Sequence, residues 1–153
     1  MEIKTLNPRE ADVRAIIQDI DTLMNSLYPA ESNQLLSVAE LESDHVHFIG
    51  GMLNDQIACC GAIVHKNNDG VYGELKRIYV LPEFRGKGLS RKIMTALLDH
   101  AASLGLSMIR LETGTRQPEA IGLYEALGFT RRGPYGDYPD DPFSVFMELD
   151  TRR

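Results

Sequence analysis

Apolar positions along this chain recur with two different periods, which predict where helices and strands alternate. From Val13 to Leu27 they return about every 3.6 residues, the spacing of an amphipathic helix, and Pro29 ends that segment. A second helical pattern starts at Leu89 and stops at Gly105, a typical C-terminal cap. The helices expected from these patterns cover residues 10–28, 33–43, 89–104 and 119–127.

Strands are expected where β-branched and aromatic residues cluster between turn signals. Asn54-Asp55 is a hairpin signal, and residues 67–70 (NNDG) form a second turn. An antiparallel run followed by a β-α-β-α-β tail predicts an α/β fold, in which a mixed, mostly antiparallel sheet carries helices on both faces. The length of 153 residues predicts a single domain over residues 1–153. The expected strands cover residues 2–6, 46–53, 56–65, 71–80, 108–113 and 144–149.

Composition narrows the class of protein. Hydrophobic residues make up 43% and charged residues 25%, as in ordinary globular chains, and no apolar stretch approaches the roughly 20 residues of a membrane span. The N-terminus has no signal-peptide pattern. A net charge of −6 argues against nucleic acid as a partner and mildly favours a cationic substrate, although solubility alone explains such a charge.

The cysteines and histidines indicate neither a disulfide nor a metal site. Cys59 and Cys60 are neighbours in an expected strand, so their side chains point to opposite faces and a bond between them would be strained. Buried thiols in a reducing cytoplasm are the simplest interpretation. The four histidines are scattered and match no zinc spacing, so we expect no metal.

The segment RGKGLS at residues 85–90 is the strongest candidate for a binding site. It joins an expected strand directly to an expected helix through two glycines, which allow close backbone approach to a ligand. Arg85, Lys87 and Arg91 add positive charge to this corner. Neither the P-loop nor the dinucleotide-binding pattern matches. The segment predicts a phosphate-carrying ligand, with an ordinary strand–helix turn as the alternative.

Two motifs together resemble one family. Residues 80–89 (VLPEFRGKGL) are similar to the acetyl-CoA signature of the GCN5-related N-acetyltransferase (GNAT) family, and residues 120–129 (AIGLYEALGF) resemble its later Ala-x-x-x-Tyr-x-x-x-Gly-Phe block. The resemblance is close over residues 75–129. In the N-terminal part, only the order of helices and strands resembles the family. Ser90 stands where the family usually has Gly or Ala, and Gln117 where many members have Asn. A bacterial subgroup of small acetyltransferases is the nearest resemblance.

The resemblance implies an acyl-CoA N-acyltransferase fold that moves the acetyl group of acetyl-CoA to a primary amine. Backbone N–H groups of residues 78–80 would bind the pantetheine arm and stabilise the developing oxyanion, and those of residues 85–90 would bind the pyrophosphate. The side chain of Gln117 would lie near the pantetheine arm. The implied cofactor residues are Ile78, Tyr79, Val80, Arg85, Gly86, Lys87, Gly88, Leu89, Ser90 and Gln117.

Three residues are candidates for proton transfer. Tyr124 matches the family's tyrosine near the CoA sulfur, the proposed general acid. Glu112 precedes it by twelve positions, a spacing similar to the branch that acetylates ribosomal-protein N-termini, where a glutamate serves as base. Glu74 lies where other branches place a base. For Glu112 the alternatives are a pairing with Arg110 or a cap of the following loop, and for Glu74 a solvated strand end or a salt bridge with Lys76. The absence of a dedicated base is a further alternative. For Tyr124 the alternative is a half-buried helix aromatic that packs on the core.

The acceptor is predicted from a loop and a helix end. Residues 133–142 supply aromatic rings and carboxylates that suit an ammonium group, with a solvated acidic turn as the alternative. The expected substrate contacts are Tyr28, Glu31, Tyr135, Asp137 and Tyr138. We expect a small amine or an amino-acid-like molecule as the acceptor, and a protein N-terminus is the second prediction. A non-catalytic acetyl-CoA-binding regulatory module and a nucleotide-binding protein are weaker alternatives, and homodimerisation stays open.

Overall fold

The computed structural model describes residues 1–33 and 35–152, and within them a seven-stranded sheet has the order β1-β2-β3-β4-β5-β7-β6. Neighbouring strands are antiparallel except β4 and β5, which are parallel. The prediction of a mixed, mostly antiparallel sheet is therefore confirmed. The strands are β1 (Glu2–Thr5), β2 (Val46–Leu53), β3 (Gln56–Lys66), β4 (Tyr72–Val80), β5 (Met108–Gly114), β6 (Thr130–Arg132) and β7 (Ser144–Asp150).

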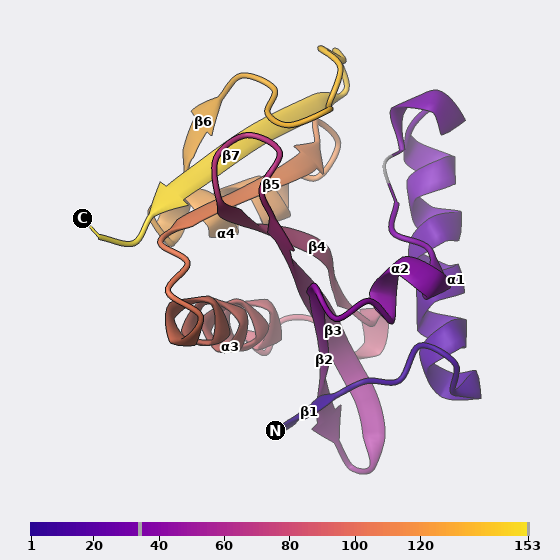
Figure 1. Ribbon diagram of the computed structural model, residues 1–153. Coiled ribbons are helices and arrows are strands. Elements are labelled where there is room, and N and C mark those ends of the chain that lie inside the picture. The colour runs from indigo at the N-terminus through magenta and orange to yellow at the C-terminus, as the bar shows by residue number, and fades with distance from the viewer. Residues whose placement is uncertain (34, 153) are drawn as a thin grey trace.

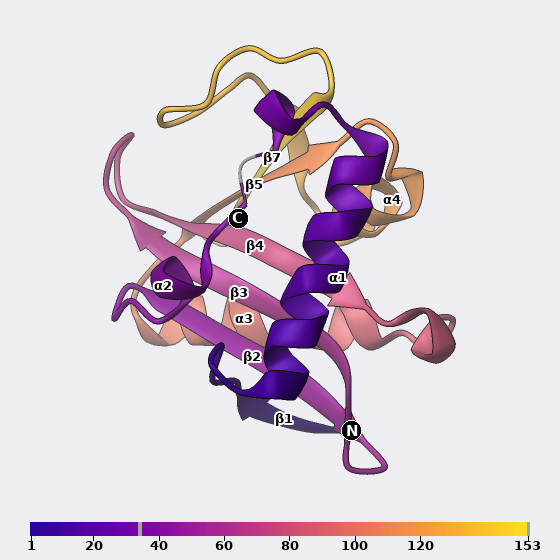
Figure 2. The same cartoon turned by 90° about the vertical axis from the view of Figure 1, so that its right-hand side faces the viewer.

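Helices cover both faces of the sheet, as predicted. α1 (Ala11–Leu27) and α2 (Val38–Leu41) lie on one side, and α3 (Leu89–Ser103) lies on the other (Figures 1 and 2). α4 (Pro118–Ala126) contributes to the same buried cluster as α3. Side chains alternate between the two faces of β3, so Cys59 packs in the cluster under α3 and Cys60 packs in the cluster under α1. Both thiols are free and buried.

Two elements differ from the sequence prediction. The helix expected over residues 33–43 is replaced by a short 3₁₀ turn, η1 (Ala30–Ser32), and the four-residue α2; residue 34 lies outside the described residues. Ser37 has an extended backbone and forms a capping box with Glu40, which delays the start of the helix. β6 was not expected, because three residues at a sheet edge are too few to show a period.

The hairpin at Asn54-Asp55 is confirmed, with both residues at positive φ (51° and 63°). A further 3₁₀ turn, η2 (Pro82–Phe84), follows β4. Among the described residues, no helix has the length and apolar character needed to cross a membrane.

The parallel pair β4 and β5 separates partway along its length, and this opening positions the site. The two strands pair at Gly73–Ile109, Glu74–Arg110 and Leu75–Leu111. Beyond these pairs, β4 continues beside β3 but with a shift of register before Tyr79, where Arg77 has φ of 57°. A bulge of this kind bends a strand. β4 therefore turns away from β5 and leaves a gap between their carboxyl ends.

Candidate active site

The gap between β4 and β5 leads into two cavities. The inner cavity, of about 100 Å³, lies against the end of α1, and the outer cavity, of about 680 Å³, extends to the start of α3. Ile78, Gln117 and Tyr124 line both cavities, so the two meet there. The inner wall also includes Met24, Tyr28, Leu36, Lys76, Arg77, Glu112, Thr113, Phe143 and Ser144. The outer wall also includes Leu27, Tyr79, Val80, Phe84, Arg85, Gly86, Gly88, Leu89, Ser90, Arg91 and Arg116.

Gly86 and Gly88 shape the end of the outer cavity. Their φ angles of 81° and 72° are left-handed, and Gly88 is the N-cap of α3 without a capping side chain. The first amides of a helix have no partner within it, so this end of α3 offers N–H donors to an anion. Arg85 and Arg91 line the same end. The result is an anion-binding corner, as expected from the sequence.

Arg85 links the end of β4 to this corner. The Arg85 Nε donates to the carbonyl of Val80 at 3.1 Å, and its guanidinium lies 5.6 Å from the ring centroid of Tyr79. All the expected cofactor residues line the outer cavity except Lys87, which is exposed and is not among the described residues of its wall. The outer cavity therefore runs from an anion-binding corner at the start of α3 to the gap between β4 and β5.

Tyr124 stands where the cavities meet. α4 holds it with 6% of its surface exposed, and its ring lies 6.0 Å from that of Phe129. Burial raises the pKa of the Tyr124 hydroxyl, and the nearby carboxyl of Glu112 raises it further. The hydroxyl therefore keeps its proton near neutral pH.

Glu112 faces the inner cavity from β5. Its Oε2 accepts a hydrogen bond of 2.8 Å from the Ser144 hydroxyl. Burial raises the pKa of this carboxyl above its usual range, against the opposing effects of Ser144 and Lys76. A carboxyl with a raised pKa is suited to exchange protons near neutral pH. The alternative pairing with Arg110 is not seen among the described contacts, since Arg110 binds Glu148 at 3.2 Å.

Glu74 lies behind the gap rather than in it. It is fully buried, its Oε1 is 2.8 Å from the ammonium of Lys66, and its Oε2 accepts a hydrogen bond of 2.6 Å from Tyr135. Burial raises the pKa of this carboxyl, but the charges of Lys76 and Lys66 and the Tyr135 bond outweigh it and hold the pKa below its usual range. Glu74 is not among the described residues that line the inner cavity.

Tyr28 closes the inner cavity from the end of α1. Its hydroxyl donates to Gln117 Oε1 at 3.3 Å and accepts from the backbone N–H of Arg116 at 3.1 Å. Gln117 Oε1 also accepts from the backbone N–H of Gly114 at 3.3 Å. Tyr28 and Gln117, predicted separately as substrate and cofactor contacts, therefore form one hydrogen-bonded unit between the two cavities.

The remaining predicted substrate residues are dispersed. Tyr135 is 2% exposed and packs among aromatic rings beside Glu74, away from the inner cavity. Asp137 and Tyr138 line a third cavity of about 360 Å³, which shares Asn33, Leu35, Leu36 and Lys76 with the inner cavity. Glu31 is exposed in η1 and lies outside these three cavities, as the described residues form them.

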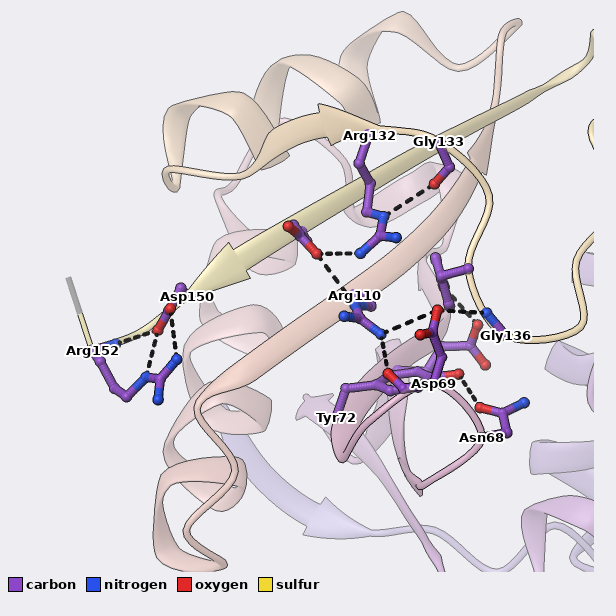
Figure 3. A network of polar contacts seen from close by, with 12 residues as sticks. Asn68, Asp69, Tyr72, Arg110, Arg132, Gly133, Gly136, Asp150 and Arg152 are labelled. Atoms are coloured by element: carbon purple, nitrogen blue, oxygen red, sulfur yellow. Dashed lines mark hydrogen bonds and ion pairs between the residues drawn. The ribbon is translucent and has the colours of Figure 1, made fainter.

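A polar network holds the loop that carries these aromatic residues. Figure 3 shows Arg110 donating to the carbonyl of Asp69, at 2.8 Å, while the Asp69 carboxylate accepts from the N–H of Gly136 at 3.2 Å. On the other side, the carboxylate of Glu148 lies between Arg110 and Arg132. The turn after β3 and the loop before β7 are thereby joined, which places Tyr138 against Lys76.

The two basic residues of the inner cavity, among those described, received no functional role from the sequence. The Arg77 guanidinium is buried and donates to Asp21 Oδ1 at 2.8 Å and to the carbonyl of Leu36 at 2.5 Å. Lys76 contacts the hydroxyl of Tyr138, and its ammonium lies 5.0 Å from the centroid of that ring. The available signal was two adjacent basic residues in an expected strand.

A parallel strand pair that opens beside a helix-end anion corner is the architecture of an acyl-CoA N-acyltransferase. The model of the acetyltransferase (GNAT) family matches residues 14–129. This chain belongs to the GNAT family, and it is an N-acetyltransferase by that membership and by its curated relatives. Members of the family use acetyl-CoA as the acetyl donor.

Relatives match almost the whole chain. An IAA acetyltransferase of Azospirillum brasilense is 39% identical over 93% of this chain and 92% of its own. The uncharacterized N-acetyltransferase YsnE of Bacillus subtilis is 30% identical over 96% of this chain and 97% of its own. The crystal structure of a putative acyl-CoA N-acyltransferase from Klebsiella pneumoniae has a TM-score of 0.80 and 31% identity, covering 98% of this chain and 97% of that one.

Proposed function

We propose that this protein transfers the acetyl group of acetyl-CoA to a primary amine of a small or amino-acid-like acceptor held in the inner cavity. The observation that carries the proposal is the meeting of the two cavities at Ile78, Gln117 and Tyr124. A donor in the outer cavity and an amine in the inner cavity would face each other across this contact. Such positioning makes the reaction effectively unimolecular.

The cosubstrate would lie with its phosphates at the anion corner and its acetyl end at Tyr124. It supplies an acetyl group activated as a thioester. Backbone N–H groups of Ile78, Tyr79 and Val80, on the strand that has left β5, are the proposed donors to the pantetheine arm and to the negative charge that develops on the acetyl oxygen. These roles use main chain, so the shape of β4 matters more than its side chains.

Glu112 is the proposed base. A free alkylamine has a pKa near ~10.4 and enters mostly protonated. Glu112 accepts that proton, directly or through water. The neutral nitrogen adds to the acetyl carbon, the C–S bond then breaks, and Tyr124 donates its proton to the departing thiolate. The amide nitrogen releases its extra proton, which returns to the Tyr124 phenolate directly or through water. The raised pKa of Glu112 supports its role as the base, and the position of Tyr124 where the two cavities meet supports its role as the acid.

A protein N-terminus is a second candidate acceptor. The third cavity adjoins the inner one through Leu35, Leu36 and Lys76, so an acceptor longer than the inner cavity would have a continuous path. A cytoplasmic location is part of the proposal and is supported by the free, buried thiols of Cys59 and Cys60.

Calorimetric titration with acetyl-CoA tests the donor half. We expect micromolar binding by the wild type and its loss in an Arg85→Glu, Gly88→Glu double variant that retains its melting temperature within a few degrees. Absence of binding by the folded wild type would refute the proposal. Thiol release on a panel of amines then tests turnover. Tight acetyl-CoA binding with no release for any small amine or peptide N-terminus would instead identify a non-catalytic acetyl-CoA-binding module.

A further inference from the structure

Lys76 occupies a place in the inner cavity that the proposed reaction does not use. It lies at the boundary between the inner and third cavities and lines both. Its ammonium is positioned by Tyr138, on the loop that Arg110 and Asp69 tie to the neighbouring turn. A charged group held in place by a dedicated network, at the wall of a binding cavity, is suited to select what enters.

The charges at the inner cavity form a pair of opposite sign. Among the described residues that line it, the charged ones are Lys76, Arg77 and Glu112. The Arg77 guanidinium is directed at Asp21 and at backbone carbonyls, on the side of α1 and the segment before α2. Lys76 on β4 and Glu112 on β5 therefore present a cation and an anion from the two walls of the gap. Glu74, buried behind Lys76, compensates part of the charge of Lys76, but its own oxygens are also bonded to Lys66 and Tyr135.

An acceptor that carries an amine alone fits this arrangement poorly. Its ammonium, or the positive charge that develops on its nitrogen, would be buried near the ammonium of Lys76, and like charges in a site of low dielectric repel strongly. A carboxylate on the same molecule removes this conflict. It would bind Lys76 through charge-assisted hydrogen bonds while the amine faces Glu112.

We infer that the acceptor is a zwitterion of the α-amino-acid type, and that Lys76 is the specificity-determining residue that binds its carboxylate. The inference rests on the proposed function, because it takes the inner cavity as the acceptor site. The rest of the molecule extends into the third cavity, whose wall carries polar groups such as Asn68, Asp137 and Glu40.

The protonation of Lys76 is consistent with this role. Burial lowers the pKa of its ammonium, and the charges of Lys66 and Arg77 act in the same direction, against Glu74 and Glu112. An anion bound beside Lys76 opposes the cost of burying its charge. Binding of the acceptor therefore stabilises the charged form of Lys76.

The test compares each of the twenty standard L-amino acids with its α-carboxamide, which keeps the amine and the side chain but loses the negative charge. Binding is measured by calorimetry on the protein saturated with CoA, which permits no turnover, and thiol release is measured in parallel with acetyl-CoA. At least one amino acid should bind the wild type about 10- to 100-fold more tightly than its carboxamide. Lys76→Met should bring this ratio to about one, whereas Lys76→Arg should keep most of it.

Lys92→Met is the matched control, because it removes one positive charge from an exposed site on α3. It should leave the ratio unchanged. Melting curves verify that every variant is folded. Equal loss of amino-acid and carboxamide binding in Lys76→Met would show a structural role and overturn the inference. So would carboxamides that bind the wild type as well as the acids, or the failure of every amino acid to bind.

The two readouts separate this inference from the proposed function. Charge-selective binding that depends on Lys76, without thiol release, would support the carboxylate site and refute the transfer reaction proposed for it. Thiol release with simple amines or carboxamides, equal to or faster than with the acids, would support acetyl transfer and overturn the inference.

Discussion

Gly114 is the residue at which a single methyl group should damage the site most directly. A Cβ built on it would lie 1.9 Å from the hydroxyl oxygen of Tyr28 and 2.0 Å from the ring carbon that carries this oxygen. Tyr28 is 7% exposed and bonded to Gln117 and the Arg116 N–H, so it cannot yield without losing these contacts. Gly114→Ala should therefore displace Tyr28 and open the wall between the cavities.

The expected change in the free energy of unfolding combines a steric clash with the loss of one hydrogen bond. Overpacking costs about 1–3 kcal/mol, and one hydrogen bond at Tyr28 contributes about 1 kcal/mol more. The expected destabilisation of about 2–4 kcal/mol corresponds to a fall in melting temperature of roughly 4–16 °C for a chain of this size. Since the Tyr28–Gln117 unit lies between both cavities, kcat/KM should fall as well.

A double-mutant cycle with Tyr28→Ala identifies the cause. Tyr28→Ala alone should cost about 3–5 kcal/mol, because it empties a buried aromatic site. In that background the methyl group of Gly114→Ala has no partner to collide with, so the second substitution should add less than about 0.5 kcal/mol. Urea unfolding of the four proteins measures the cycle. A Gly114→Ala cost that is small, or that persists without Tyr28, would refute the reasoning.

Three further predictions concern the base, the anion corner and the buried ion pair. Glu112→Gln should lower kcat/KM by about 10²- to 10⁴-fold and abolish the loss of rate that the wild type shows as pH falls through the raised pKa of Glu112. Gly88→Ala should weaken acetyl-CoA binding more than Gly88→Asn, because φ is 72° and asparagine tolerates this region better, while no atom lies within 4 Å of the added Cβ. Lys66→Met should cost about 2–4 kcal/mol, because the buried carboxylate of Glu74 loses the ammonium bonded to it and keeps only the charge of Lys76 nearby. Because the folded-state pKa of Glu74 is lowered, its contribution to stability is present above the unfolded value of about 4.3 and disappears as pH falls through the folded value, so Lys66→Met should move acid unfolding to higher pH.

Each of these predictions has a distinct contrary result. An unchanged acidic limb of the pH–rate profile in Glu112→Gln would assign that limb to another group. Equal acetyl-CoA affinities for Gly88→Ala and Gly88→Asn would show that the left-handed backbone is not what the corner requires. An acid-unfolding midpoint of Lys66→Met that matches the wild type would show that the ion pair with Glu74 does not set the stability of the folded chain at low pH.

Local features of the sequence predicted most of the fold. The period of the apolar residues is a property of each segment alone, and α1, α3, α4 and the six longer strands lie close to their expected ranges. The anion corner could also be predicted from the sequence, because its left-handed backbone conformation is local and favours glycine at positions 86 and 88. The helix expected over residues 33–43 was wrong because Ser37 caps a later start, and three-residue β6 has no period to detect.

The sequence by itself therefore determined most of the elements and the anion corner, because these depend on residues close together in the chain, and the order of the elements indicated a mixed sheet. Only the tertiary structure decided which of two similar glutamates faces the cavity. Alternation gave both Glu74 and Glu112 a polar position, but Tyr135, 61 residues away, bonds the first, and the departure of β4 from β5 exposes the second to the gap. Contacts between distant segments have no local pattern in the sequence. The arrangement of the site therefore depends on the separation of β4 from β5 and on the contact of the loop before β7 with Lys76.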